Sequence, residues 1–358
     1  MTSAHLKDEQ HTDAQAGDAA ALKLDEHALR VLYLELFGRP PYDTEREHWL
    51  GRSLPELLDE HIGSPEFWRH WYEEQLYYFL LVDNFRPETD ALKELPAKLA
   101  QGEFDVRTVL HRIALSSSFD LRNPGADTFV TVVLEQLVGL TVQKHEGVLA
   151  GGKGAYQGRS STFLGSSAVS QSDVVRIAIE SKDAMRHLAT REFERLFRTP
   201  PERRVLARWA RELFLEPKAY AAIVRSWLLS EAFSERLAST APKSNQLFVR
   251  SLFVDLIGRL PSDAEALPMR DALDGLSDSR PLRSVMVRLL VDSKDVRLPK
   301  KEDIEDRTLW LAGLFPRFYG RAANKQELEA FATAFNEPDC RPETVLYALL
   351  TAPEYHRY

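Results

Sequence analysis

A short phrase that recurs along the chain limits what it can fold into. The phrase reads Leu34-Glu-Leu-Phe-Gly-Arg-Pro-Pro41 near the start and returns three times in altered form. The later copies are Leu196-Phe-Arg-Thr-Pro-Pro201, Leu256-Ile-Gly-Arg-Leu-Pro261 and Phe318-Tyr-Gly-Arg321. A chain that repeats itself in this way is expected to stack copies of one structural element.

A second phrase closes each copy. It is a hydrophobic stretch that ends on a small residue and then an acidic or aromatic one. The clear versions are His61-Ile-Gly-Ser-Pro-Glu-Phe67, Leu228-Leu-Ser-Glu-Ala-Phe233, Leu289-Leu-Val-Asp-Ser-Lys-Asp295 and Leu349-Leu-Thr-Ala-Pro-Glu-Tyr355. Degenerate versions are Ala114-Leu-Ser-Ser-Ser-Phe119 and Ala178-Ile-Glu-Ser-Lys-Asp-Ala-Met185. The spacing of roughly 50 to 65 residues predicts four clear repeats and two degenerate ones.

The third copy shows why the phrase predicts a corner between two helices. Apolar residues in 249–257 fall at i, i+3, i+4, i+7 and i+8, which is one face of a helix. Gly258 follows, where a left-handed residue ends a helix, and Pro261 prevents continuation. The stretch Ser262-Asp-Ala-Glu265 has the capping-box pattern of a new helix start. Packing alone explains these residues.

The sequence therefore predicts an all-α fold of tandem helical repeats, packed as a compact array or a short solenoid. We divide it into a flexible polar tail at 1–23, first repeats at 24–123, a degenerate repeat at 124–186 and three repeats at 187–358. Residues 128–139 are rich in β-branched residues, but their apolar spacing predicts a helix that ends at Gly139.

Residues 147–171 change composition to glycine and serine, which predicts a long mobile or partner-contacting loop. Gly152-Lys153 is followed by Gly154 and not by Ser or Thr, so the stretch lacks the phosphate-binding motif. We nevertheless keep three of its side chains as candidate contacts for a ligand or partner: Lys153, Tyr156 and Arg159.

The aromatic density of residues 67–79 is far above that of the rest of the chain. On a helix, much of this stretch would form core against neighbouring repeats. Its polar members could instead line a pocket for a peptide or small molecule. The candidate binding residues here are Trp68, His70, Trp71, Tyr72, Glu73, Tyr77 and Tyr78.

Composition argues against several functions. The net charge of −8 argues against nucleic-acid binding. Arg191 to Arg211 is rich in arginine, but Glu192 and Glu194 interleave with it, as on a solvated, ion-paired helix. The single cysteine, Cys340, excludes an internal disulfide and fits a reducing compartment. We expect no cofactor, no metal site, no catalytic residues and no membrane span.

One resemblance supports the fold. Residues 28–78, with the Gly-Arg-Pro-Pro corner and the ending Gly63-Ser-Pro-Glu-Phe-Trp-Arg-His-Trp71, resemble bacterial helical modules of unknown function. Residues 246–295 are similar to the same pattern. Such modules often occur in exported multi-domain proteins, some beside c-type cytochrome domains. We expect no export signal in this chain, and the sequence contains no Cys-x-x-Cys-His haem site, so the resemblance implies a fold and no reaction.

The sequence thus predicts a cytoplasmic interaction or scaffold protein built from helical repeats, with a protein as its partner. The interpretation leans against an enzyme because no acid, base and nucleophile stand at a recognisable spacing. The alternative is an enzyme or small-molecule-binding protein with a pocket between repeats near residues 67–79.

Overall fold

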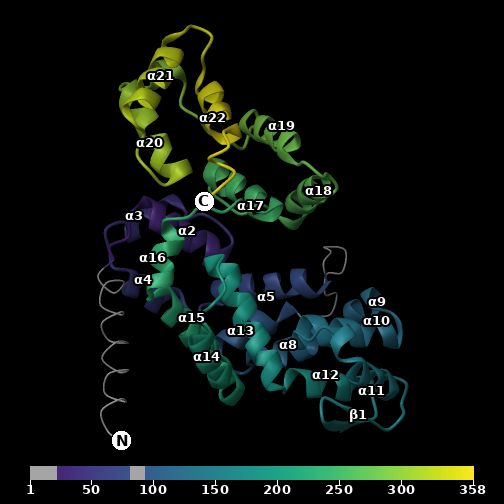
Figure 1. Cartoon of the computed structure of the whole chain (residues 1–358). Helices are drawn as coiled ribbons and strands as arrows, with labels where there is room; N and C mark the ends of the chain where they lie inside the picture. The colour runs from purple at the N-terminus through teal and green to yellow at the C-terminus, as the bar shows by residue number, and fades with distance from the viewer. Residues whose placement is uncertain (1–21, 81–92) are drawn as a thin grey trace, which may run out of the picture. The chain divides into compact units, whose positions relative to one another are not determined.

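The computed structural model describes residues 22–80 and 93–358 and is all-α (Figure 1). The only strands in these ranges are β1 (Ser161–Phe163) and β2 (Ser166–Ala168), which form an antiparallel hairpin. Most of the predicted tail at 1–23 lies outside the described residues. The predicted fold class is confirmed, whereas the packing of repeats into an array stays a prediction.

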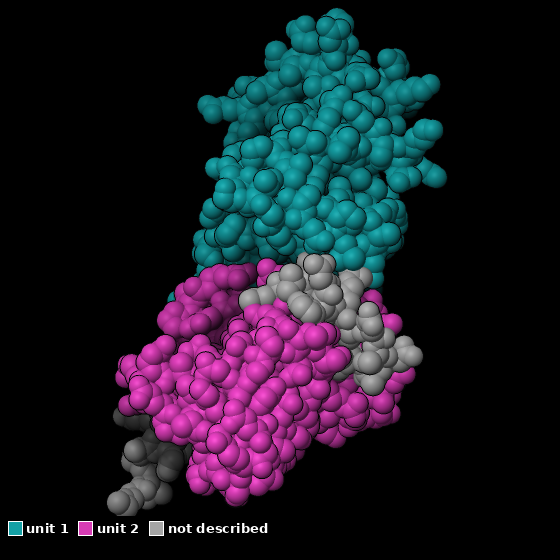
Figure 2. Space-filling model, turned by 90° about the vertical axis from the view of Figure 1, so that its right-hand side faces the viewer, with its two compact units in different colours: residues 1–57, 234–358 teal, residues 58–233 magenta. Residues whose placement is uncertain are grey.

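The chain divides into two compact units, coloured separately in Figure 2. Unit 1 joins residues 1–57 to residues 234–358, and unit 2 is residues 58–233. The described helices of unit 1 are α2 (Glu26–Phe37), α3 (Asp43–Trp49), α17 (Asn245–Ile257), α18 (Asp263–Asp274), α19 (Arg280–Val291), α20 (Arg307–Tyr319), α21 (Lys325–Asn336), α22 (Pro342–Thr351) and the 3-10 turn Lys301–Asp303. The unit boundaries fall within α4 (Leu54–His61) and α16 (Glu231–Leu237).

Unit 2 contains the hairpin and a second set of helices. These are α5 (Pro65–Leu80), α7 (Leu95–Ala100), α8 (Val106–Ala114), α9 (Ser117–Arg122), α10 (Gly125–Val132), the π-helix η1 (Val133–Val138), α11 (Glu146–Tyr156), α12 (Gln171–Ile179), α13 (Lys182–Phe197), α14 (Arg203–Leu215), α15 (Tyr220–Leu228) and the 3-10 turns Val142–Lys144 and Pro217–Ala219. The helix predicted over residues 128–139 is therefore present, with its second half wound as a π-helix.

The predicted corners share one local geometry. Gly38, Gly258 and Gly320 all have positive φ, between 65° and 77°, and each ends its helix in the left-handed conformation. The arginine after each glycine binds, through two nitrogen atoms, a glutamate six residues further on. The N···O distances are 2.6 and 2.8 Å for Arg39–Glu45, 2.9 and 2.8 Å for Arg259–Glu265, and 2.8 and 2.7 Å for Arg321–Glu327.

The corner glutamate has a second structural role, because it is also the third residue of the next helix. There it accepts a hydrogen bond from the backbone N–H of the residue that caps that helix, at 2.7 Å for Tyr42 and 2.7 Å for Ser262. In the remaining copy Arg198 itself takes the left-handed position, with φ 60°. Thr199 and Val205 replace the arginine and glutamate there, so both halves of the pair are lost together.

The prediction of a long loop over 147–171 is wrong. Residues 146–156 form α11, and the hairpin follows. The glycines of α11 allow neighbouring elements to pack close to its backbone. A Cβ on Gly151 would lie 1.9 Å from the carbonyl oxygen of Thr162, and one on Gly152 would lie 2.5 Å from the Val130 side chain. The glycine face of α11 therefore lets β1 and α10 approach its backbone, a use of glycine that composition does not separate from a loop.

This packing predicts opposite effects for glycines of the same helix. Replacing Gly151 or Gly152 with alanine is expected to lower the free energy of unfolding by about 3 kcal/mol, because backbone and core atoms must move. Gly147 has nothing within 4 Å of its missing Cβ, so Gly147→Ala is expected to raise stability by up to about 1 kcal/mol. Urea denaturation followed by circular dichroism measures both. Equal effects at Gly147 and Gly151 would contradict the packing.

Candidate functional site

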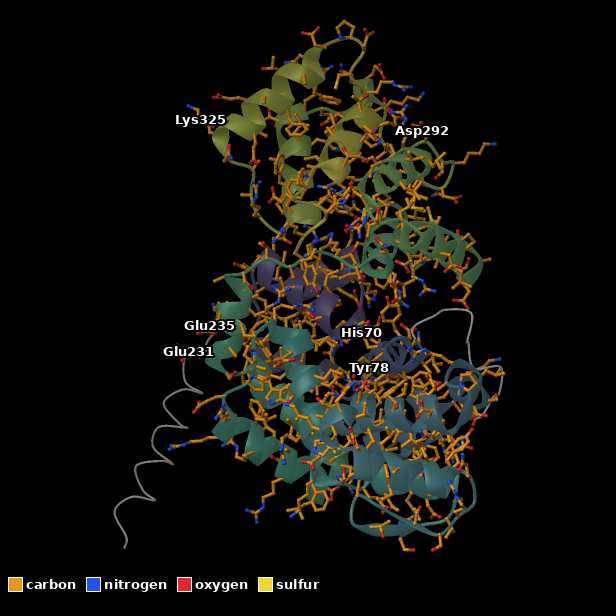
Figure 3. All side chains as sticks on the ribbon, turned by 45° about the vertical axis from the view of Figure 1, so that its right-hand side comes forward. His70, Tyr78, Glu231, Glu235, Asp292 and Lys325 are labelled. Carbon is orange, nitrogen blue, oxygen red and sulfur yellow. The ribbon has the colours of Figure 1, made fainter. Side chains whose placement is uncertain are left out.

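The aromatic candidates on α5 lie mainly in the core of unit 2. Trp68, His70, Trp71 and Tyr72 are all buried, and both tryptophan rings contact Tyr220, with ring centroids 5.8 and 5.5 Å away. Tyr77 is exposed, and Glu73 and Tyr78 are half-buried. Figure 3 shows His70 and Tyr78 on this helix. The structure thus puts four of the seven predicted residues among packing groups, and their binding role stays a prediction.

The other three candidates lie around α11. Lys153 forms an ion pair with Asp127 at 2.5 Å, and the ring of Tyr156 packs against Phe129, 5.2 Å between centroids. Arg159 is exposed and donates to Gln157 at 2.5 Å. Helix α11 packs on α10, α12 and β1, whereas α5 packs on α7, α8 and α9. The two groups of candidates therefore surround different helices of unit 2.

A buried charge cluster centred on Glu192 was missed from the sequence. Glu192, on α13, is 1% exposed and accepts hydrogen bonds from Gln75 and Tyr220, each at 2.9 Å. Arg191 and Arg195 form ion pairs with it at 3.2 and 3.3 Å. The prediction that Glu192 lies on a solvated helix surface is wrong, because alternation of charges in the sequence does not show which side of α13 faces α5 and α15.

Opposing forces set the charge of this cluster. Burial alone would raise the pKa of Glu192, but Arg195, Arg191 and the two hydrogen bonds bring its pKa below its usual value. Burial and the neighbouring carboxylate raise the pKa of Tyr220 well above its usual value. Glu192 is therefore a carboxylate and Tyr220 a neutral hydrogen-bond donor around pH 7. The arrangement ties α5, α13 and α15 together and leaves the carboxylate no access to a substrate.

Beside the cluster lies a recess of about 240 Å³, whose wall includes Phe79, Gln136, His187 and Arg191. The space open to a water-sized molecule is only about 10 Å³, which is roughly one water. The Arg191 guanidinium lies 4.0 Å from the centre of the Tyr78 ring, and the Tyr78 hydroxyl lies 3.4 Å from His187 Nε2. One residue of the predicted pocket, Tyr78, thus contacts two residues of the recess wall, which is otherwise mainly apolar.

The π-helix η1 supplies one polar group of this recess, Gln136, whereas His187 and Arg191 come from α13. Gln136 has a buried side-chain oxygen without a hydrogen-bond partner among the described residues, and the Gln136 backbone bonds to His187. Gly139 ends the π-helix with φ 76°, and a Cβ there would lie 2.6 Å from His187 Nδ1. The imidazole is therefore held against backbone where only glycine fits. Single π-helical turns are frequent at functional sites.

His187 predicts a decline of stability in acid. Burial, then the charge of Arg191, lowers the pKa of His187 to about 4. Below pH 6.5 the unfolded chain binds a proton at this residue that the folded chain does not bind until about pH 4. Stability should therefore fall across that window, by at most about 3 kcal/mol.

Urea titrations at several pH values measure this decline. His187→Gln is expected to reduce it, and His356, whose pKa burial also lowers to about 4, should account for much of the remainder. His48→Gln, at an exposed histidine, should leave it unchanged. If stability falls as steeply in His187→Gln as in wild type, then proton binding by His187 does not differ between the folded and unfolded chains.

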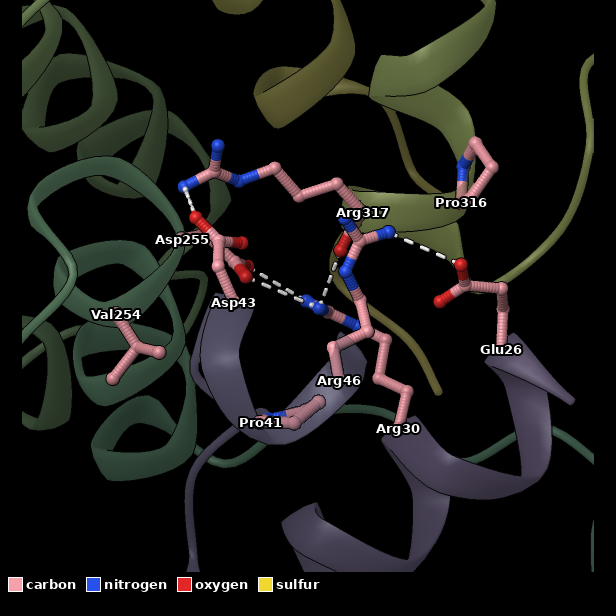
Figure 4. Close-up of a pocket in the computed structure, with 9 residues that line it drawn as sticks. All are labelled: Glu26, Arg30, Pro41, Asp43, Arg46, Val254, Asp255, Pro316 and Arg317. Carbon is pink, nitrogen blue, oxygen red and sulfur yellow. Dashed lines mark hydrogen bonds and ion pairs between the residues drawn. The ribbon is translucent and has the colours of Figure 1, made fainter. Parts of the chain in front are cut away.

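A second polar pocket lies in unit 1 (Figure 4). Arg30 binds Asp255 through two nitrogen atoms, at 2.7 and 3.1 Å, and donates to the backbone oxygen of Arg317 at 2.7 Å. Around it, Arg46 pairs with Glu26 at 3.1 Å and Arg317 with Asp43 at 3.4 Å.

This pocket is a set of structural ion pairs. Its three arginines are balanced by three carboxylates, and its water-sized space is only about 10 Å³. The contacts join α2 and α3 to α17 and α20, which are distant in the sequence. Their geometry leaves no charge free for a ligand.

A buried lysine lies near Arg30 and Asp255. Lys243 is 2% exposed, and its ammonium donates to the backbone oxygen of Tyr355 at 2.7 Å. Burial, then the charge of Arg30, holds the pKa of Lys243 well below its usual value. The Tyr355 hydroxyl donates to Asp255 at 2.8 Å. A lysine with a lowered pKa is a possible nucleophile, but this one is enclosed by packed side chains.

Two further clefts in unit 1 are open and have charged walls. One lies between the corner at Gly258 and residues 294–297, with about 550 Å³ open to water-sized molecules, and the other lies beside Asp292 and Arg341, with about 440 Å³. Both border the segment after α19. These clefts have the volume of ligand sites, although their walls are more polar than usual.

Two features are absent from residues 22–80 and 93–358: a metal-binding cluster and a membrane-spanning helix. Nowhere in these ranges do three or more His, Cys, Asp or Glu side chains gather so that they could hold a metal ion. No helix in the same ranges has the length and apolar character needed to cross a membrane.

Comparison with known proteins identifies no relative. No family model, no curated protein and no solved structure matches the chain.

Proposed function

We propose that this chain is a non-catalytic protein-interaction scaffold built from helical repeats. The observation that carries the proposal is that the chain's polar groups fall into two kinds, buried ones and ones that line open clefts. Glu192 and Lys243, whose pKa values are both lowered, are buried and hydrogen-bonded to distant residues of their own unit. The spacious clefts are instead open, and their walls carry ordinary surface charges.

Catalysis needs an acid, base or nucleophile within reach of a bound substrate. Glu192 and Lys243 are 1% and 2% exposed, so a substrate would have to displace the core to reach them. Cys340 is half-buried, and burial raises the pKa of its thiol, which makes it a poor nucleophile at neutral pH. These features favour binding over chemistry.

The repeated corners fit the same role. Each is a rigid turn held by a left-handed residue, and three carry an arginine–glutamate pair. Stacked copies would present a firm surface with variable side chains, as helical-repeat proteins do. The proposal includes a protein partner and a reducing, cytoplasmic setting, which the single cysteine fits.

The test uses the full chain as bait in a lysate of the native host. Bound proteins, metabolites and metals are identified together, and the leading protein is then purified and titrated against the purified chain. A one-to-one complex with a dissociation constant in the micromolar range or tighter is expected. Co-purification of a metabolite or metal without any protein would overturn the proposal.

A specific observation favours the alternative of a small-molecule binder in unit 2. The unpartnered oxygen of Gln136 lies in the wall of the recess beside His187 and Tyr78. A ligand with an N–H or O–H donor would satisfy this oxygen if neighbouring side chains moved to enlarge the space. Native mass spectrometry of wild type and Gln136→Leu tests this alternative, because only the wild type should retain such a ligand.

A further inference from the structure

The open cleft at the corner of α17 and α18 has an asymmetric charge. Four cationic side chains border it, Arg259, Lys294, Arg297 and Arg317, against two carboxylates, Asp43 and Asp295. Glu265, which does not border the cleft, pairs with Arg259, so the cations exceed the carboxylates by one (four minus three), although the whole chain carries −8. This local excess of positive charge would attract an acidic partner and orient it on approach.

The four cationic side chains differ in whether they already form an ion pair. Arg259 binds Glu265 through both terminal nitrogen atoms, and Arg317 is 3.4 Å from Asp43. Lys294 and Arg297 are exposed, and neither forms an ion pair with a described residue. Two exposed cations, opposed by the carboxylate of Asp295, thus border a cleft with about 550 Å³ open to water-sized molecules.

We propose that this cleft binds an acidic, extended segment of a protein partner. This inference rests on the proposed function and specifies the surface that performs it. Lys294 and Arg297 would each pair with a carboxylate of the segment.

The shape and lining of the cleft favour a peptide over a compact anion such as phosphate. Asp43 and Asp295 border the same space and would repel a dense negative charge. Half-buried Leu256 and Ile257 offer apolar contact to side chains that lie between the carboxylates. A Cβ on Gly258 would meet nothing within 4 Å, so a chain can approach this part of the backbone.

Fluorescence anisotropy with the purified full chain tests the inference. The probe is the labelled peptide Gly-Asp-Leu-Glu-Leu-Asp-Gly, and its counterpart Gly-Asn-Leu-Gln-Leu-Asn-Gly lacks the charges. Wild type should bind the acidic peptide measurably and the neutral one much more weakly. Lys294→Glu/Arg297→Glu should weaken binding of the acidic peptide about tenfold or more, since two ion pairs become repulsions.

The matched control is Lys300→Glu/Lys325→Glu, which makes the same change of net charge at exposed residues of unit 1 outside the cleft. It should retain nearly all affinity. Equal loss in both variants, equal binding of the two peptides, or no binding of the acidic peptide would overturn the inference. Displacement by inorganic phosphate at constant ionic strength would also overturn it and assign the cleft to a small anion.

These outcomes are separable from failure of the proposed function. If the lysate provides a protein partner but the peptide does not bind, the partner docks elsewhere and only the present inference fails. If no protein partner exists, peptide binding by itself cannot rescue the scaffold function.

Discussion

Replacing Arg30 with methionine should lower the free energy of unfolding by about 3–5 kcal/mol, because it leaves Asp255 buried without its cation. The two side chains are 7% and 3% exposed, and their closest nitrogen and oxygen atoms are 2.7 Å apart. Lys243 cannot take over this role, since its ammonium bonds to a backbone oxygen of Tyr355. Chemical denaturation measures the loss.

Two controls make this result specific. Arg280→Met removes an exposed pair with Asp278 and should leave stability nearly unchanged. The triple variant Arg30→Met/Asp255→Leu/Tyr355→Phe removes the charges and the hydroxyl bonded to Asp255, so it should recover much of the loss. A single-variant cost below about 1 kcal/mol would mean that water reaches Asp255.

Glu192→Leu should destabilise unit 2 by a similar amount, about 3–5 kcal/mol. It leaves Arg191 and Arg195 without their carboxylate and removes the acceptor of the Tyr220 hydroxyl. Glu192→Gln should cost less, because an amide oxygen can still accept one hydrogen bond. Thermal denaturation followed by near-ultraviolet circular dichroism suits this region, which has several tryptophan and tyrosine rings in contact.

The control for this prediction is Glu194→Leu on the same helix. Glu194 is exposed and two residues from Glu192, so the change should stay within about 0.5 kcal/mol. If both leucine variants cost the same, Glu192 is solvated and the buried cluster does not hold α5, α13 and α15 together.

Local signals in the sequence predicted the local structure well. Gly258, Pro261 and the capping box at Ser262 predicted the corner between α17 and α18, and the structure confirms it. The same reasoning identified a helix ending at Gly139. These features depend on residues a few positions apart, so the sequence contains nearly all the information they require.

The features that the sequence did not predict depend on contacts between residues that are far apart in the chain. Glycines 151 and 152 predicted a loop, but they allow α11 to pack on β1, and only the position of Thr162 shows this. Arg30 and Asp255 are 225 positions apart, and Gln75 and Glu192 are 117 apart. No local pattern links such pairs. The cleft residues were missed for the same reason, because Asp43, Gly258 and Lys294 come from three separate segments.

The most direct test of the scaffold function is a calorimetric titration of the purified partner into three forms of the chain. The forms are wild type, Lys294→Glu/Arg297→Glu and Gln136→Leu. We predict that the cleft variant loses about tenfold or more in affinity, while Gln136→Leu binds as wild type does. Undiminished binding by the cleft variant together with loss in Gln136→Leu would contradict this prediction and move the functional site to the recess beside His187.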